Sequence, residues 1–208
     1  MRIIPEATPT PEPTMVPAPP SPPAPLRNRM EESMVKSGVL MLTDKFDQKT
    51  IMPLVQQIMM LNMLPEAEQP EEIKLYINSP GGSVFSAWHL IDTMKQSRIP
   101  VSTIAMGLAA SCGVLTLMAG AKGRRFVTQN TSVMSHTFSW GSMGKEGELY
   151  AKVKEYEMAS ERMVNHYKKC TGKNEKYIRK YLLHPHDEWM SPEEVVKHGI
   201  ADEIIETY

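Results

Sequence analysis

The sequence predicts an α/β fold built from repeated strand–helix units around a largely parallel sheet. Short apolar runs alternate with longer segments in which apolar residues recur at helical spacing. Turns made of glycine or other small residues follow two of the apolar runs, at 78–82 and 109–113. In parallel sheets such turns lie at the carboxyl ends of strands, where α/β proteins place their functional sites.

In the first half of the chain, strands are recognised as short apolar runs and helices by apolar residues three and four positions apart. Asp47 is a residue type that caps helices. Gly107 is expected to end the third strand, because glycine weakens strands. The expected elements are a strand at 39–42, a helix from Asp47 through Leu61, a strand at 73–77, a helix through Trp88 and Met94, a strand at 101–106 and a helix from Ser111.

The second half continues with short strands and then becomes mainly helical. Ser191 begins a capping box with Pro192 at the first helical position, and Gly199 is placed to end that helix. The expected elements are strands at 125–128 and 132–135, a long charged helix from Glu146 to about Cys170, helices at 174–183 and 191–199, and a last strand at 201–205.

The N-terminal segment has a different composition. Residues 1–26 hold ten of the seventeen prolines, so this segment cannot form regular ladders and has little to bury. We expect a disordered Pro-rich arm at 1–30 and one folded domain at 31–208. A Pro-rich ligand for a partner domain is the alternative for the arm.

Composition and charge narrow the possible partners and the compartment. A formal net charge of −1 gives no electrostatic basis for binding nucleic acid or an anionic membrane. Two cysteines and the lack of a continuous N-terminal apolar stretch favour a reducing, cytosol-like compartment. The uncharged stretch between Arg98 and Lys122 is long enough to cross a bilayer, but its glycines and hydroxyls favour a buried strand followed by a helix.

Three residues supply the parts of an acyl-transfer site. Ser111 lies in a small-residue turn, His136 ends an apolar run, and Asp187 precedes a capped helix. A serine hydroxyl needs a base to take its proton and a carboxylate to orient that base. The backbone N–H groups at Ser111 and Cys112 would begin a helix, and Gly81 and Gly82 allow another N–H to approach, so an oxyanion hole is expected here.

Taken singly, these features have simpler interpretations. Ser111 is also typical of a helix cap, and the glycine pair is typical of a tight turn. A lone histidine such as His136 is more often structural than catalytic. Cys112 is a rival nucleophile. The cluster around His184 and His186 suggests a metal site, but its spacing matches no strong zinc pattern, so no metal and no cofactor are expected. Phosphate-binding glycine motifs are also missing, so no nucleotide site is expected.

Together, the ordered motifs closely resemble the proteolytic subunit of the Clp protease (ClpP) family over about residues 36–206. The motifs lie at 76–82, 92–94, 101–104, 109–111, 119–126, 134–136, 187 and 190–194, with Gly199. The resemblance implies a ClpP/crotonase-like fold with a protruding handle helix, in the region of about 137–170. It also implies a serine endopeptidase with Ser111 as nucleophile, His136 as base, Asp187 as orienting carboxylate, and an oxyanion hole from Gly82 and Cys112.

The resemblance further implies stacked heptameric rings, a separate AAA+ unfoldase and unfolded polypeptide substrates. It places the protein in the cytoplasm, an organelle stroma or a phage-infected cell. Cys112 stands where the family usually has methionine, Thr137-Phe138 replace Gln-Pro, and Pro185-His186 replace Glu-Arg. These departures leave open a mixed ring rather than a homomeric one. The other functions considered are a non-catalytic ring subunit, a crotonase-type acyl-CoA enzyme and a phage head-maturation protease.

Overall fold

The structure is a computed structural model that describes residues 26–137, 141 and 143–206. Most of the predicted Pro-rich arm lies outside these residues. Its last residues belong to helix α1 (Leu26–Lys36), so the domain boundary predicted at residue 31 falls inside a helix. None of the helices in the described ranges is long and apolar enough to cross a membrane.

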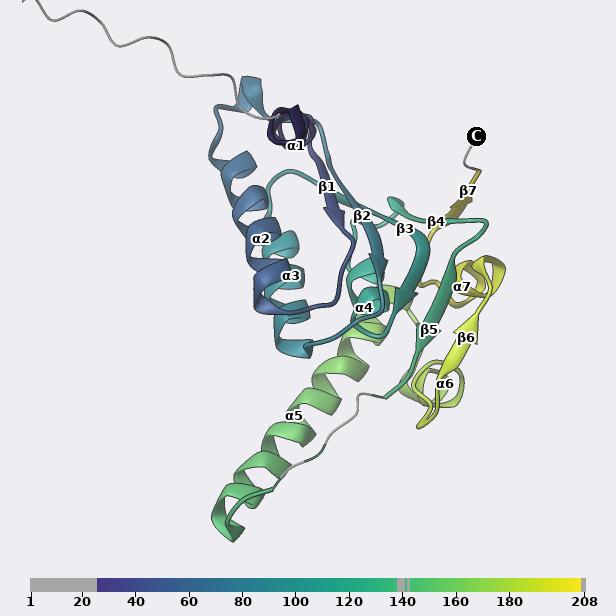
Figure 1. The fold of residues 1–208 in the computed structure, drawn as a ribbon. Coiled ribbons are helices and arrows are strands. Elements are labelled where there is room, and N and C mark those ends of the chain that lie inside the picture. Colours follow the sequence, from purple (N-terminus) through teal and green to yellow (C-terminus); the bar gives the residue numbers. More distant parts are fainter. Residues whose placement is uncertain (1–25, 138–140, 142, 207–208) are drawn as a thin grey trace, which may run out of the picture.

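A seven-stranded sheet forms the centre of the fold (Figure 1). Its main order is β1-β2-β3-β4-β7, and β5 pairs with both β3 and β6. All of these pairings are parallel except that of β5 with β6, which confirms the largely parallel sheet. The strands are β1 (Val39–Leu42), β2 (Ile73–Ser79), β3 (Val101–Ala110), β4 (Arg125–Thr128), β5 (Ser132–Ser135), β6 (Glu188–Met190) and β7 (Glu203–Ile205).

The helices begin and end close to the predicted positions. Asp47 accepts a hydrogen bond from the Thr50 N–H at 2.9 Å, and Ser191 forms the predicted capping box. Helix α1, the short 3₁₀ helix η1 (Glu66–Glu68) and strand β6 are absent from the sequence prediction. The other helices are α2 (Gln48–Met63), α3 (Val84–Gln96), α4 (Cys112–Met118), α5 (Glu146–Thr171), α6 (Glu175–Tyr181) and α7 (Pro192–His198).

The prediction that the third strand ends at Gly107 is wrong, because Gly107 bends strand β3 and does not end it. The strand continues to Ala110, and Gly107 has a φ of +78°. The pairing with β2 shifts at this point: Ile77 pairs with Ala105 and Ser79 with Ala109, so β3 has two more residues than β2 between these pairs and forms a bulge. The part before the bulge pairs with β4 at 103–105, and the part after it pairs with β5 at 108–110. The bend therefore directs the end of β3 toward β5.

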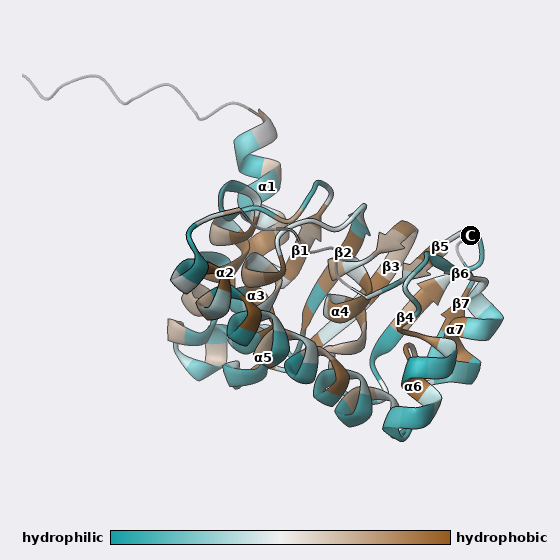
Figure 2. Ribbon diagram, turned by 90° about the horizontal axis from the view of Figure 1, so that it is seen from below, coloured by the Kyte–Doolittle hydropathy of each residue, from teal (hydrophilic) through white to brown (hydrophobic). Residues whose placement is uncertain are grey.

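The core lies between the sheet and the helices α2, α3 and α4, which cover the same side of the strands in both ribbon views (Figures 1 and 2). The strands are largely apolar, whereas the helices alternate apolar and polar residues, as Figure 2 shows. Helix α5 extends away from this body (Figure 1), as the predicted handle helix does. Its buried residues all lie in its C-terminal half and are Ala159, Met163, Val164 and Tyr167.

Arg125 connects four elements below the surface. Its side chain donates hydrogen bonds to the Asp202 carboxylate, to the Cys170 carbonyl at 2.9 Å and to the Gly199 carbonyl at 3.0 Å. Burial opposes ionisation of Asp202, but hydrogen bonds from Arg125 outweigh it and hold the pKa of that carboxyl below its ordinary value. The start of β4, the ends of α5 and α7, and the loop before β7 are therefore joined at one guanidinium.

We predict that Arg125→Met lowers the free energy of unfolding by about 3–5 kcal/mol, because it leaves the Asp202 charge and two carbonyls without their partner. The matched control is Arg124→Met, since Arg124 is exposed and its side chain pairs with Glu72 at 3.2 Å. That variant should lose less than about 1 kcal/mol. Urea unfolding at one protein concentration measures both, and equal stability of the two variants would contradict the prediction.

Candidate active site

Ser111 occupies a strained turn between β3 and α4. Its φ is +54°, and it is the one non-glycine residue with positive φ in the described part of the chain. Such a conformation costs about 1–3 kcal/mol and persists only where surrounding contacts enforce it. The Ser111 N–H donates to the Met134 carbonyl at 2.8 Å, which joins the turn to β5. The hydroxyl makes no capping bond to α4, so the interpretation of Ser111 as a helix-capping residue is wrong.

The Ser111 hydroxyl instead contacts His136. Strands β3 and β5 are parallel neighbours, with Ala110 opposite Met134, so the residues that follow them lie at the same edge of the sheet. His136 Nε2 is 2.9 Å from Ser111 Oγ. With Nε2 unprotonated, the imidazole accepts the hydroxyl hydrogen, as a general base requires.

Asp187 reaches the same edge from the other side of His136. Strand β6 pairs antiparallel with β5, with Glu188 opposite Ser135, and this places Asp187 across from His136. The distance from Asp187 Oδ1 to His136 Nδ1 is 3.9 Å, which is within ion-pair range but too long for a hydrogen bond. The His136 side chain is 18% exposed and that of Asp187 is 57% exposed. The structure thus brings the three residues together, with the carboxylate about 1 Å short of a hydrogen bond.

The glycine turn packs directly against Ser111. Gly81 has a φ of +95°, and a Cβ on it would lie 2.7 Å from the Ser111 Cβ. A Cβ on Gly82, whose φ is +144°, would overlap the backbone of Phe46. Both positions therefore require glycine, because of backbone conformation and because of space.

The backbone groups predicted for the oxyanion hole lie on two adjoining segments. Cys112 is the first residue of α4, so its N–H has no acceptor within the helix. The Cys112 thiol donates to the Gly82 carbonyl at 3.3 Å, which ties the start of α4 to the glycine turn. The negative charge that forms on the carbonyl oxygen, when Ser111 attacks the carbonyl carbon, would lie near the positive end of α4.

Cys112 is not placed to act as the nucleophile. Its side chain is buried and directed to the Gly82 carbonyl. Burial raises the pKa of the thiol to about 11. The reactive thiolate is therefore scarce at neutral pH.

Comparisons with known proteins identify related sequences. The family model for the Clp protease matches residues 26–208. The chain is also similar to the ATP-dependent Clp protease proteolytic subunit of Deinococcus radiodurans. The two are 34% identical over 175 residues, which cover 83% of this chain and 82% of that protein.

We predict that iodoacetamide leaves Cys112 unmodified in the folded protein at pH 8, because the thiol stays protonated and buried below its pKa of about 11. The same residue should react fully after unfolding in urea. Peptide mass mapping measures both states. Rapid alkylation of Cys112 in the folded protein would contradict the buried position and restore it as a rival to Ser111.

Proposed function

Because the chain belongs to the Clp protease family and is a peptidase of the serine type, we propose that Ser111, His136 and Asp187 are its catalytic triad. The observation that carries the proposal is the 2.9 Å contact between Ser111 Oγ and His136 Nε2. A strained turn with no capping role for its hydroxyl gives further support, since such strain concentrates at functional sites.

In the proposed mechanism, His136 Nε2 takes the hydroxyl proton as Ser111 Oγ attacks the carbonyl carbon of a peptide. The N–H groups of Gly82 and Cys112 stabilise the tetrahedral oxyanion. The imidazolium then gives its proton to the leaving amine, and water hydrolyses the acyl-enzyme by the same steps in reverse. Asp187 holds the His136 tautomer and stabilises the imidazolium after closing by about 1 Å, a tightening common when substrate binds.

We further propose that the protein forms heptameric rings that stack through α5. The N-terminal half of this helix leaves the body and exposes apolar side chains, including Tyr150 at 70% and Met158 at 53%. Exposed apolar surface of this kind is typical of an interface. This chain carries no phosphate-binding glycine motif, so a separate AAA+ unfoldase would use the ATP and deliver unfolded polypeptides. We propose the cytoplasm as the compartment.

The other functions considered from the sequence have less support. The Clp protease model covers most of the chain, and this argues against an acyl-CoA enzyme or a phage head-maturation protease. A non-catalytic ring subunit would not need a serine hydroxyl in contact with an imidazole. The domain proposed for catalysis is the predicted range 31–208, extended at its start by the first residues of α1, with its handle formed by α5.

We predict that Ser111→Ala lowers kcat for a short fluorogenic peptide by a factor on the order of 10⁶, because the nucleophile is lost. The control is Ser132→Ala, which removes an exposed hydroxyl from β5 and should leave kcat unchanged. Light scattering should give both variants the mass of fourteen 23.4 kDa chains. Wild-type turnover by Ser111→Ala would contradict the triad, and a smaller particle would contradict the stacked rings.

We predict that Asp187→Asn lowers kcat by about 10⁴, because an amide cannot stabilise the imidazolium and favours the wrong tautomer of His136. The matched control is Asp92→Asn, an exposed carboxylate on α3. It should retain wild-type kcat. A loss below tenfold in Asp187→Asn would mean that the 3.9 Å separation persists in the working enzyme and that another group orients His136.

A further inference from the structure

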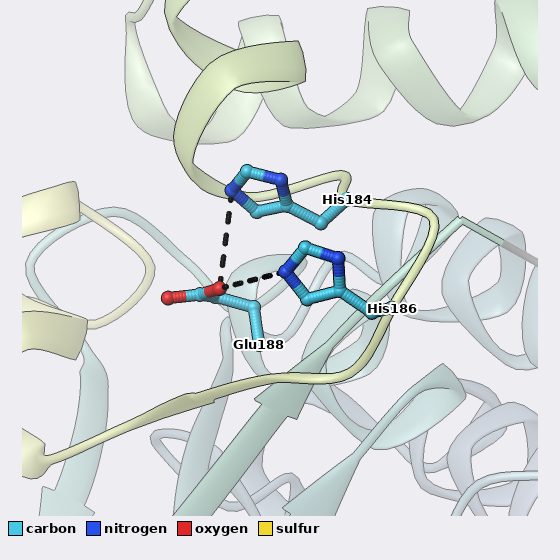
Figure 3. A group of neighbouring side chains, drawn as sticks. All are labelled: His184, His186 and Glu188. Carbon is cyan, nitrogen blue, oxygen red and sulfur yellow. Dashed lines mark ion pairs between the residues drawn. The ribbon is translucent and has the colours of Figure 1, made fainter.

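Three side chains next to the proposed triad have the chemistry of metal ligands. His184 and His186 lie between α6 and β6, and Glu188 is the first residue of β6. Figure 3 shows both imidazoles facing the carboxylate of Glu188. The sequence pattern had pointed only to the two histidines, because the strand that adds Glu188 was not predicted. Three ligands at alternate positions, His-x-His-x-Glu, are the signal that was available.

The ligand atoms converge on one small volume. One oxygen of Glu188, Oε2, lies 3.8 Å from His184 Nε2 and 3.9 Å from His186 Nε2. All three ligand atoms lie within 4.8 Å of one another. In a tetrahedral zinc site with bonds of about 2.0–2.2 Å, neighbouring ligand atoms are about 3.3–3.5 Å apart. Each histidine–glutamate pair therefore needs to close by only about half an ångström to reach this geometry.

These three ligand atoms make no hydrogen bond in the described part of the chain. The two distances to Glu188 exceed hydrogen-bond length, and no hydrogen bond found there uses Nε2 of either histidine. The side chains of His186 and Glu188 are 69% and 37% exposed, so they can adjust to an ion that enters from solvent. The His184 side chain is more enclosed, since 26% of it is exposed.

We propose that His184, His186 and Glu188 bind one Zn²⁺ ion, with water as a fourth ligand. Two neutral imidazoles and one carboxylate suit Zn²⁺ better than Mg²⁺ or Ca²⁺, which prefer oxygen ligands. The inference goes beyond the peptidase function and does not require it.

The site is connected to the proposed triad through the backbone. Asp187 lies between two of the ligands in the chain, and it is the member of the triad that stops short of a hydrogen bond. The His184 carbonyl accepts a hydrogen bond of 2.8 Å from the Thr137 N–H, directly after His136. A bound ion would therefore restrain the segment that carries Asp187.

The test is metal binding by the full-length, assembled protein, measured without any substrate. Zn²⁺ is titrated against a chromophoric chelator, and Co²⁺ is added separately to give the visible absorption of a tetrahedral site. We expect one ion per chain. The double variant His184→Ala/His186→Ala should bind at least 100-fold more weakly, since loss of outer-shell partners alone costs 10- to 100-fold.

Three further variants identify which side chains hold the ion. Glu188→Gln keeps the side-chain shape and should also weaken binding. His89→Ala removes an exposed histidine on α3 and should bind as the wild type does. His136→Ala should also keep its ion, because the proposed ligands do not include the triad.

Binding that is lost in His136→Ala and kept in the double variant would place the ion between His136 and Asp187 and overturn the proposal. Equal binding by all variants, or no binding by the wild type, would overturn it as well. None of these outcomes depends on peptide hydrolysis, so a failure here is distinct from a failure of the triad.

Discussion

The strained turn at Ser111 is the constraint on which the candidate site depends. A serine at a φ of +54° is unfavourable by about 1–3 kcal/mol. The turn is held by the hydrogen bond from its N–H to Met134 on β5 and by close packing against Gly81. The bulge at Gly107 makes this possible, because it turns the end of β3 toward β5. The free energy of strand pairing therefore offsets the strain at Ser111. The resulting turn places the Ser111 hydroxyl next to His136.

The members of the proposed triad are held with unequal firmness. Ser111 and His136 follow neighbouring parallel strands and are already in contact at 2.9 Å. Asp187 precedes the three-residue strand β6, is more than half exposed and stops 3.9 Å from His136. The adjustable part of the site is therefore the segment that also carries the proposed zinc ligands. A restraint on this segment would act on the carboxylate directly, and on the backbone next to His136 through the hydrogen bond from the Thr137 N–H to the His184 carbonyl.

Catalysis and assembly are assigned to different parts of the fold. The residues of the proposed triad lie at one edge of the sheet, whereas the N-terminal half of α5 extends into solvent with exposed apolar residues. The two parts are joined below the surface by a hydrogen bond of 2.6 Å between the hydroxyls of Tyr167 on α5 and Ser135, the residue before His136. Arg125 joins the end of the same helix to β4 and Asp202. These hydrogen bonds would connect the proposed interface on α5 to the edge that carries the proposed triad.

The sequence by itself determined the helices from α2 to α7, most strands and the identities of the three candidate catalytic residues, because periodicity, caps and motifs are local signals. Asp47 and Ser191 behave as their residue types predict. Only tertiary structure decided that β3 continues through Gly107, since pairing with β5 overrides the weak strand preference of glycine. Long-range pairing also created β6, set the short contact at Ser111 and the longer one at Asp187, and brought Glu188 to the two histidines. These features depend on which distant segments become neighbours, and a local pattern does not contain that information.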